Sequence, residues 1–96
     1  MKITLIPQRR DDTLSVSKQG DTLTINGEAL DFSQLPEGAT LPKGAVGNLF
    51  ITSDVERIDG ELQLSLLLPY GSGASNAAKF PEPIINPADG ELELPQ

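Results

Sequence analysis

The amino-acid sequence predicts an all-β fold, a small antiparallel meander folded as a sandwich or an open barrel with at most one helical turn. Apolar and polar residues alternate with a period of two along most of the chain, which is typical of strands with one buried face. Asn-Gly and Asp-Gly pairs, which are strong signals for hairpin turns, stand between the alternating runs. No window of useful length has the three- and four-residue apolar spacing of an amphipathic helix. The 96 residues fit one β domain, residues 1–96.

Short alternating runs and tight turns make up the first third of the chain. Each of the first three runs places two aliphatic residues on one face: Ile3 and Leu5, Leu14 and Val16, Leu23 and Ile25. Gly20 can adopt the positive φ that a tight turn between the second and third runs requires. The Asn26-Gly27 pair predicts a type I′ hairpin that joins residues 22–25 to residues 28–32.

The longest predicted strand is residues 61–68, which Asp59-Gly60 joins to residues 55–58 in a second hairpin. One face of this strand carries Leu62, Leu64, Leu66 and Leu68. Leu67 breaks the alternation, so the end of the strand is apolar on both faces and needs a second layer or a partner to cover it. A further Asp89-Gly90 pair predicts a hairpin between residues 84–85 and 91–94.

Two segments do not alternate. Residues 33–48 carry two prolines and read as an ordered loop, with one possible helical turn capped by Ser33 and with Leu35 and Leu41 as anchors to the core. Residues 70–83 begin with a flexible Gly/Ser composition and end in a proline-rich stretch. The tail, residues 84–96, is expected to be a C-terminal hairpin or an arm laid across a neighbouring molecule.

The composition excludes several classes of function. The chain has no His and no Cys, so the familiar zinc sites, Ser-His-Asp triads and thiol chemistry are impossible, and we predict no catalytic, cofactor-binding or metal residues. Fourteen acidic and seven basic residues give a net charge of −7, which disfavours nucleic-acid binding. The apolar runs are too short for a signal peptide or a membrane span, so a cytoplasmic location and no membrane association are expected.

The densest group of acids does not match a calcium loop. It comprises Asp54, Glu56, Asp59 and Glu61. Ile58 occupies a position where a calcium loop needs an oxygen ligand, and Asp59 stands where the loop needs glycine. We expect Arg57 to pair across the hairpin with one of these acids instead.

One possible interaction surface follows from the unusual end of the 61–68 strand. Its residues are Leu66, Leu67, Leu68, Tyr70 and Phe80. Either the segment that holds Phe80 folds over Leu67 within the same molecule, or a second subunit covers it. The second alternative makes a homo-oligomer possible.

Two stretches carry a further pattern, LTINGEALDFS followed by LPEGA at residues 23–39, and VERIDGEL at residues 55–62 followed by LPYG and FPEPI. Together they resemble segments of small proteins encoded among the tail and tail-fibre genes of tailed bacteriophages and prophages. That family has no established activity, so the resemblance carries over no functional residues.

Taken together, the composition and the resemblance favour a non-enzymatic accessory protein of a phage or prophage. It would be an interaction or structural component linked to tail or tail-fibre assembly. Its expected partner is a phage tail component or a second copy of the chain. Its expected location is the host bacterial cytoplasm, with incorporation in the phage particle as a further possibility. The alternative is an acidic, host-directed phage inhibitor that binds a host protein.

Overall fold

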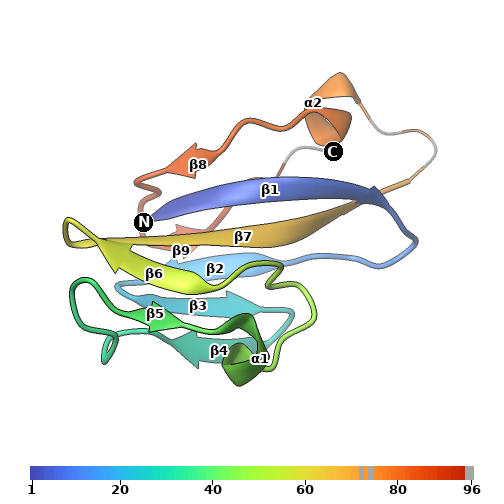
Figure 1. Ribbon diagram of the computed structural model, residues 1–96. Coiled ribbons are helices and arrows are strands. Elements are labelled where there is room, and N and C mark those ends of the chain that lie inside the picture. Colours follow the sequence, from blue (N-terminus) through green and yellow to red (C-terminus); the bar gives the residue numbers. More distant parts are fainter. Residues whose placement is uncertain (72, 74, 95–96) are drawn as a thin grey trace.

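The computed structural model describes residues 1–71, 73 and 75–94, and it arranges their strands in two sheets that face each other (Figure 1). The first sheet has the strand order β5-β6-β7-β1-β8, and the second has β4-β3-β2-β9. The strands of the first sheet are β5 (Thr40–Leu41), β6 (Val55–Ile58), β7 (Glu61–Tyr70), β1 (Lys2–Arg9) and β8 (Ile84–Ile85). Those of the second are β4 (Glu28–Asp31), β3 (Thr22–Ile25), β2 (Val16–Gln19) and β9 (Gly90–Glu91). The predicted all-β class is confirmed, as an open sandwich.

The two longest strands pair in parallel, which an antiparallel meander does not contain. Lys2 lies opposite Gln63 and Arg9 lies opposite Tyr70. This register aligns Ile3 with Leu64 and Leu5 with Leu66, so the aliphatic faces of β1 and β7 form one continuous surface. The other pairings between named strands are antiparallel across the described residues.

Both long strands contain a proline, and each proline occupies a position where the β1–β7 ladder needs no N–H donor. The N–H of Arg10 donates to the carbonyl of Tyr70, and the N–H of Asn86 donates to the carbonyl of Met1. The backbone N–H and C=O groups of successive residues alternate in direction along a strand. At the odd-numbered positions of β1, Pro7 among them, they therefore point away from β7. Pro69 likewise points away from β1, because the N–H of Leu67 donates to Phe50 on the other side.

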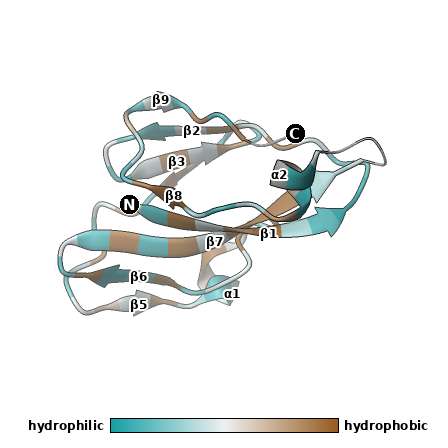
Figure 2. Ribbon diagram, turned by 90° about the horizontal axis from the view of Figure 1, so that it is seen from above, coloured by the Kyte–Doolittle hydropathy of each residue, from teal (hydrophilic) through white to brown (hydrophobic). Residues whose placement is uncertain are grey.

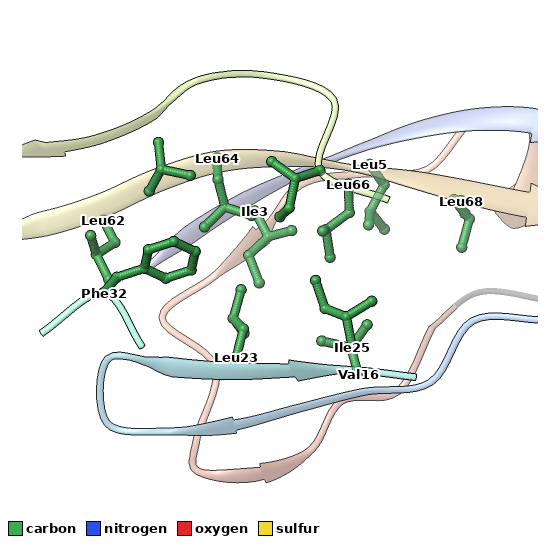
Figure 3. Close-up of a cluster of buried hydrophobic side chains, with 12 residues drawn as sticks. Ile3, Leu5, Val16, Leu23, Ile25, Phe32, Leu62, Leu64, Leu66 and Leu68 are labelled. Carbon is green, nitrogen blue, oxygen red and sulfur yellow. The ribbon is translucent and has the colours of Figure 1, made fainter. Parts of the chain in front are cut away.

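The apolar residues between the sheets form one core cluster (Figure 3). Its buried members are Ile3, Leu5, Val16, Leu23, Ile25, Phe32, Ile51, Val55, Leu62, Leu64, Leu66 and Leu68. Figure 2 shows hydrophobic and hydrophilic residues alternating along β7, as expected for a strand with one face on this core. Leu35 and Leu41 are partly buried against the cluster, as predicted.

Two four-residue helices, α1 (Lys43–Val46) and α2 (Asn76–Lys79), replace the single helical turn expected near Ser33. At Ser33 the chain forms a tight turn. The Asp31 carboxylate accepts a hydrogen bond from the N–H of Ser33, and the carbonyl of Phe32 accepts one from the N–H of Leu35. Helix α1 begins after Pro42 and ends at Gly47, which has a φ of 72°. With β5, it gives the 33–48 segment regular structure. In the 70–83 segment, Ser72 and Ala74 lie outside the described residues.

The predicted C-terminal hairpin is wrong, because β8 and β9 belong to different sheets. Strand β8 pairs with β1, whereas β9 pairs with β2. The Asp89 carboxylate accepts hydrogen bonds from Lys18 Nζ (2.7 Å) and from the N–H of Gly20 (3.1 Å), so it holds the β2–β3 turn. A hairpin that includes only residues 84–85 on one side would form few hydrogen bonds, so pairing of β8 with β1 and of β9 with β2 is preferred.

The three other predicted hairpin turns are confirmed, the first of them at Gly20, which has a φ of 58° between β2 and β3. Asn26 and Gly27 have φ values of 49° and 87°, and Asp59 and Gly60 have 52° and 77°. Two successive positive φ values define a type I′ turn, whose twist matches that of the flanking strands.

Replacing Gly27 with valine is expected to lower the free energy of unfolding by about 1–3 kcal/mol, because a β-branched residue is strained at positive φ. A Cβ atom at this position meets nothing within 4 Å, so backbone strain is the main contribution. Urea unfolding measures the change. Gly71→Val is the matched control, because Gly71 is equally open and has no positive φ. Equal unfolding midpoints for the two variants would contradict the turn assignment.

Candidate functional site

The structure does not bring the five predicted interaction residues into one exposed surface. Leu66 and Leu68 are fully buried and point between the sheets (Figure 3). Tyr70 is half-buried at the end of β7, where its carbonyl accepts the N–H of Arg10 at 3.1 Å. Leu66 and Leu68 are therefore core residues and are not available to a partner.

Leu67 does not need a second subunit to cover it. Its exposed fraction is only 9% in the isolated chain. The segment that follows α1 extends the edge of β7 beyond β6: the N–H of Leu67 donates to Phe50 (2.8 Å), and that of Thr52 donates to Ser65 (3.0 Å). Phe50 and Leu67 line one surface hollow. The isolated chain thus buries Leu67 without a second subunit.

Phe80 is the one residue of the five whose side chain is largely accessible, at 78% exposed. Its backbone is nevertheless anchored. The N–H of Phe80 donates to the carbonyl of Asn76 (2.8 Å), and α2 packs against β1 and β7 with Ala78 buried. The backbone therefore places Phe80 at a defined position on the surface, immediately before Pro81.

Arg57 does not pair with the acids of its own hairpin, which corrects the prediction. Its guanidinium reaches across to the second sheet, where Nη2 lies 3.0 Å from Asp21 Oδ2. It also donates to the carbonyls of Leu35 (2.6 Å) and Phe32 (3.2 Å). The Arg57 side chain is only 15% exposed, so this network joins the two sheets at one end of the core. Among the described residues, no group of three or more acidic side chains lies close enough together to hold a metal ion.

A polar hollow of about 370 Å³ lies on the outer face of the first sheet. Its polar lining residues are Lys2, Thr4, Ser53, Asp54, Glu56, Gln63 and Ser65. Two of these side chains already serve the fold. Ser53 Oγ accepts the N–H of Ser65 (3.0 Å), and Asp54 Oδ1 accepts that of Lys43 (2.8 Å). The remaining side chains offer hydrogen bonds and single charges of both signs.

Two surface carboxylates have pKa values below the ordinary 3.8 of aspartate. The hydrogen bond from Lys18, followed by that from the Gly20 N–H, lowers the pKa of Asp89. The backbone N–H of Ser33 lowers the pKa of Asp31. Both effects stabilise the ionised form, which is also the form that holds the turns together.

Stability is expected to fall on acidification as these carboxylates are protonated. A carboxyl with a lowered folded-state pKa stabilises the fold above its unfolded pKa, and this contribution is lost as the pH falls through the folded value. Urea midpoints measured between about pH 6 and about pH 2 test this. Wild type should lose more stability than Asp89→Asn over this interval, and the two should converge at the acidic end. Parallel pH profiles would contradict the role of Asp89.

The described geometry defines a small, open two-sheet β-sandwich with an anchored, exposed aromatic residue. Comparison with known proteins gave no match to a family model, to a curated protein or to a solved structure. None of the helices in the described part of the chain is long and apolar enough to cross a membrane.

Proposed function

We propose that the chain is a non-enzymatic accessory protein of a tailed phage or prophage that binds a protein partner during tail or tail-fibre assembly. The exposed Phe80 is the observation that carries the binding role. Aromatic residues, Phe among them, are enriched at protein interfaces relative to the rest of the protein surface. The resemblance of residues 23–39, 55–62 and 80–84 to proteins encoded among tail genes supports the biological setting.

The residue chemistry supports a binding role over catalysis. Ser53, Asp54, Arg57 and Asp89 are all committed to hydrogen bonds that hold strands and turns. The hollow on the first sheet has no His or Cys, and its polar groups lie open to water, where charges are well solvated.

Mass spectrometry of purified particles of the phage that encodes the chain tests the assembly role. We expect the chain at a fixed stoichiometry, or associated with a tail component before assembly is complete. If the chain is absent from particles and from tail components, and specifically captures one host protein, the result would instead support the acidic host-directed inhibitor.

Replacing Phe80 with alanine is expected to reduce incorporation or partner association while changing the free energy of unfolding by less than about 0.5 kcal/mol. The ring contributes little to the core because it is 78% exposed. Leu49→Ala is the matched control, since Leu49 is 91% exposed and is not next to the proline segment. Quantification of each variant in particles, alongside urea unfolding, gives both readouts. Equal incorporation of the two variants would exclude Phe80 as the anchor.

A further inference from the structure

Edge strands present unpaired backbone groups, which proteins normally protect against pairing with other chains. In the described part of the fold, the outermost strands are β5, β8, β9 and β4. The first three are each two residues long. The long strands β1 and β7 extend beyond their short neighbours, but Pro7 and Pro69 lie at these projecting ends. Strand β4 has four residues and neither a proline nor a lysine.

The register of the β3–β4 hairpin shows which backbone groups of β4 are free to pair. The N–H of Phe32 donates to the carbonyl of Asp21 at 3.0 Å. Hydrogen-bonded and non-hydrogen-bonded pairs alternate along an antiparallel ladder, so the pairs formed by Ala29 and Asp31 are of the second kind. The N–H and C=O groups of Ala29 and Asp31 therefore point away from β3, toward the open edge of the second sheet.

The side chains on this edge leave it accessible and give it negative charge. Glu28, Ala29 and Asp31 are exposed, whereas Leu30 is half-buried against the core. The Glu28 carboxylate accepts a hydrogen bond from Asn48 Nδ2 (3.0 Å), and the Asp31 carboxylate accepts one from the N–H of Ser33 (2.9 Å). These bonds hold two acids beside the unpaired backbone groups.

Charge decides which kind of strand fits this edge. A second copy of β4 would bring the same acids together, in a chain with a net charge of −7. Successive side chains of a strand point to opposite faces, so Glu28 and Asp31 lie on opposite faces of β4. Opposite charges placed across a strand pair are stabilising, so a lysine or arginine on either face of an added strand can complement one of these acids. A bound strand can form main-chain hydrogen bonds with both Ala29 and Asp31, while its basic side chains supply selectivity.

We propose that β4 is a docking edge for an extended, basic segment of a protein partner, which adds to the second sheet as a further strand. The inference rests on the proposed function only in taking the partner to be a protein. Phe80 and β4 are separate contacts, and each can be removed without altering the other.

Nuclear magnetic resonance with the isotope-labelled protein and a synthetic Lys-Val-Lys-Val-Lys-Val-Lys peptide tests the proposal. We expect saturable shifts centred on β4 and slower hydrogen exchange at the amides of Ala29 and Asp31. Ala29→Pro removes one outward N–H without removing a bond to β3, and it should weaken binding by at least about tenfold. Ala29→Val keeps the N–H and should bind within about twofold of wild type.

Two further measurements separate strand addition from general attraction between charges. A Glu-Val-Glu-Val-Glu-Val-Glu peptide has the same pattern with the opposite charge and should not bind. A Lys-Val-Lys-Pro-Lys-Val-Lys peptide keeps the charge and loses a central N–H, so it should bind more weakly. Shifts spread over acidic residues without amide protection at β4, equal binding of Ala29→Pro, or dimerisation of the free chain through β4 would each overturn the proposal.

The proposal and the assembly role fail independently. Peptide binding at β4 by a chain that is absent from particles and tail intermediates would leave the docking edge and remove the assembly role. Incorporation of Ala29→Pro at the wild-type level, with no peptide bound at β4, would remove the docking edge and leave the assembly role.

Discussion

Replacing Arg57 with methionine is expected to lower the free energy of unfolding by about 2–4 kcal/mol. Methionine retains much of the apolar stem but removes the donors to the carbonyls of Leu35 and Phe32. Partly buried acceptors left without donors lose the bonds that offset their desolvation. Asp21 is partly exposed and regains water, so its ion pair contributes only a small share.

Urea unfolding of Arg57→Met measures this effect, with Arg9→Met as the control for loss of an arginine from an exposed position. Arg57→Lys should be intermediate, because a single ammonium group cannot reproduce the guanidinium fork that bonds several acceptors. An Arg57→Met variant as stable as Arg9→Met would mean that apolar packing compensates for the network.

Replacing Leu66 with alanine is expected to lower the free energy of unfolding by about 2–5 kcal/mol, through lost burial and the cavity that remains. Leu66 has no exposed surface and lies on the core face of β7, opposite Leu5. Leu49→Ala removes the same atoms from a residue that is 91% exposed, and it should change stability by less than about 0.5 kcal/mol.

Denaturant midpoints of the two leucine variants give the comparison directly. If Leu66→Ala is unfolded without denaturant, Ile3→Val provides a milder test at the same core, with an expected loss of about 0.5–1.5 kcal/mol. Equal stability of Leu66→Ala and Leu49→Ala would contradict the placement of Leu66 between the sheets.

Local features could be predicted from the sequence, whereas features that join distant segments could not. The Asn26-Gly27 turn is predictable because its conformation depends on two adjacent residues. The pairing of Lys2 with Gln63 has no adjacent turn to signal it. A short apolar run at an N-terminal position is compatible with an edge strand or with the central strand that β1 proves to be.

The candidate site shows the same limit. Val55 is buried, so the period of two already places Arg57 on the inner face of β6. Its partner Asp21, however, lies in the β2–β3 turn of the other sheet. For Leu67 the sequence left two covers open, the Phe80 segment or a second subunit, and it did not reveal that residues 50–52 pair with the edge of β7. The sequence predicts β4 as a strand, but a free edge becomes visible only when the strand order is known.

The parallel pairing of β1 with β7 has a consequence for how the chain reaches its native state. During synthesis, the residues of β1 leave the ribosome long before those of β7, with which they must pair. The β2–β3–β4 hairpins close over two-residue turns and can assemble within microseconds once they emerge. Completion of the first sheet must wait for a long-range loop closure, which makes it the slow step, on the scale of milliseconds to seconds. Until then, the aliphatic face of β1 is without its native partner and is exposed to association with other chains.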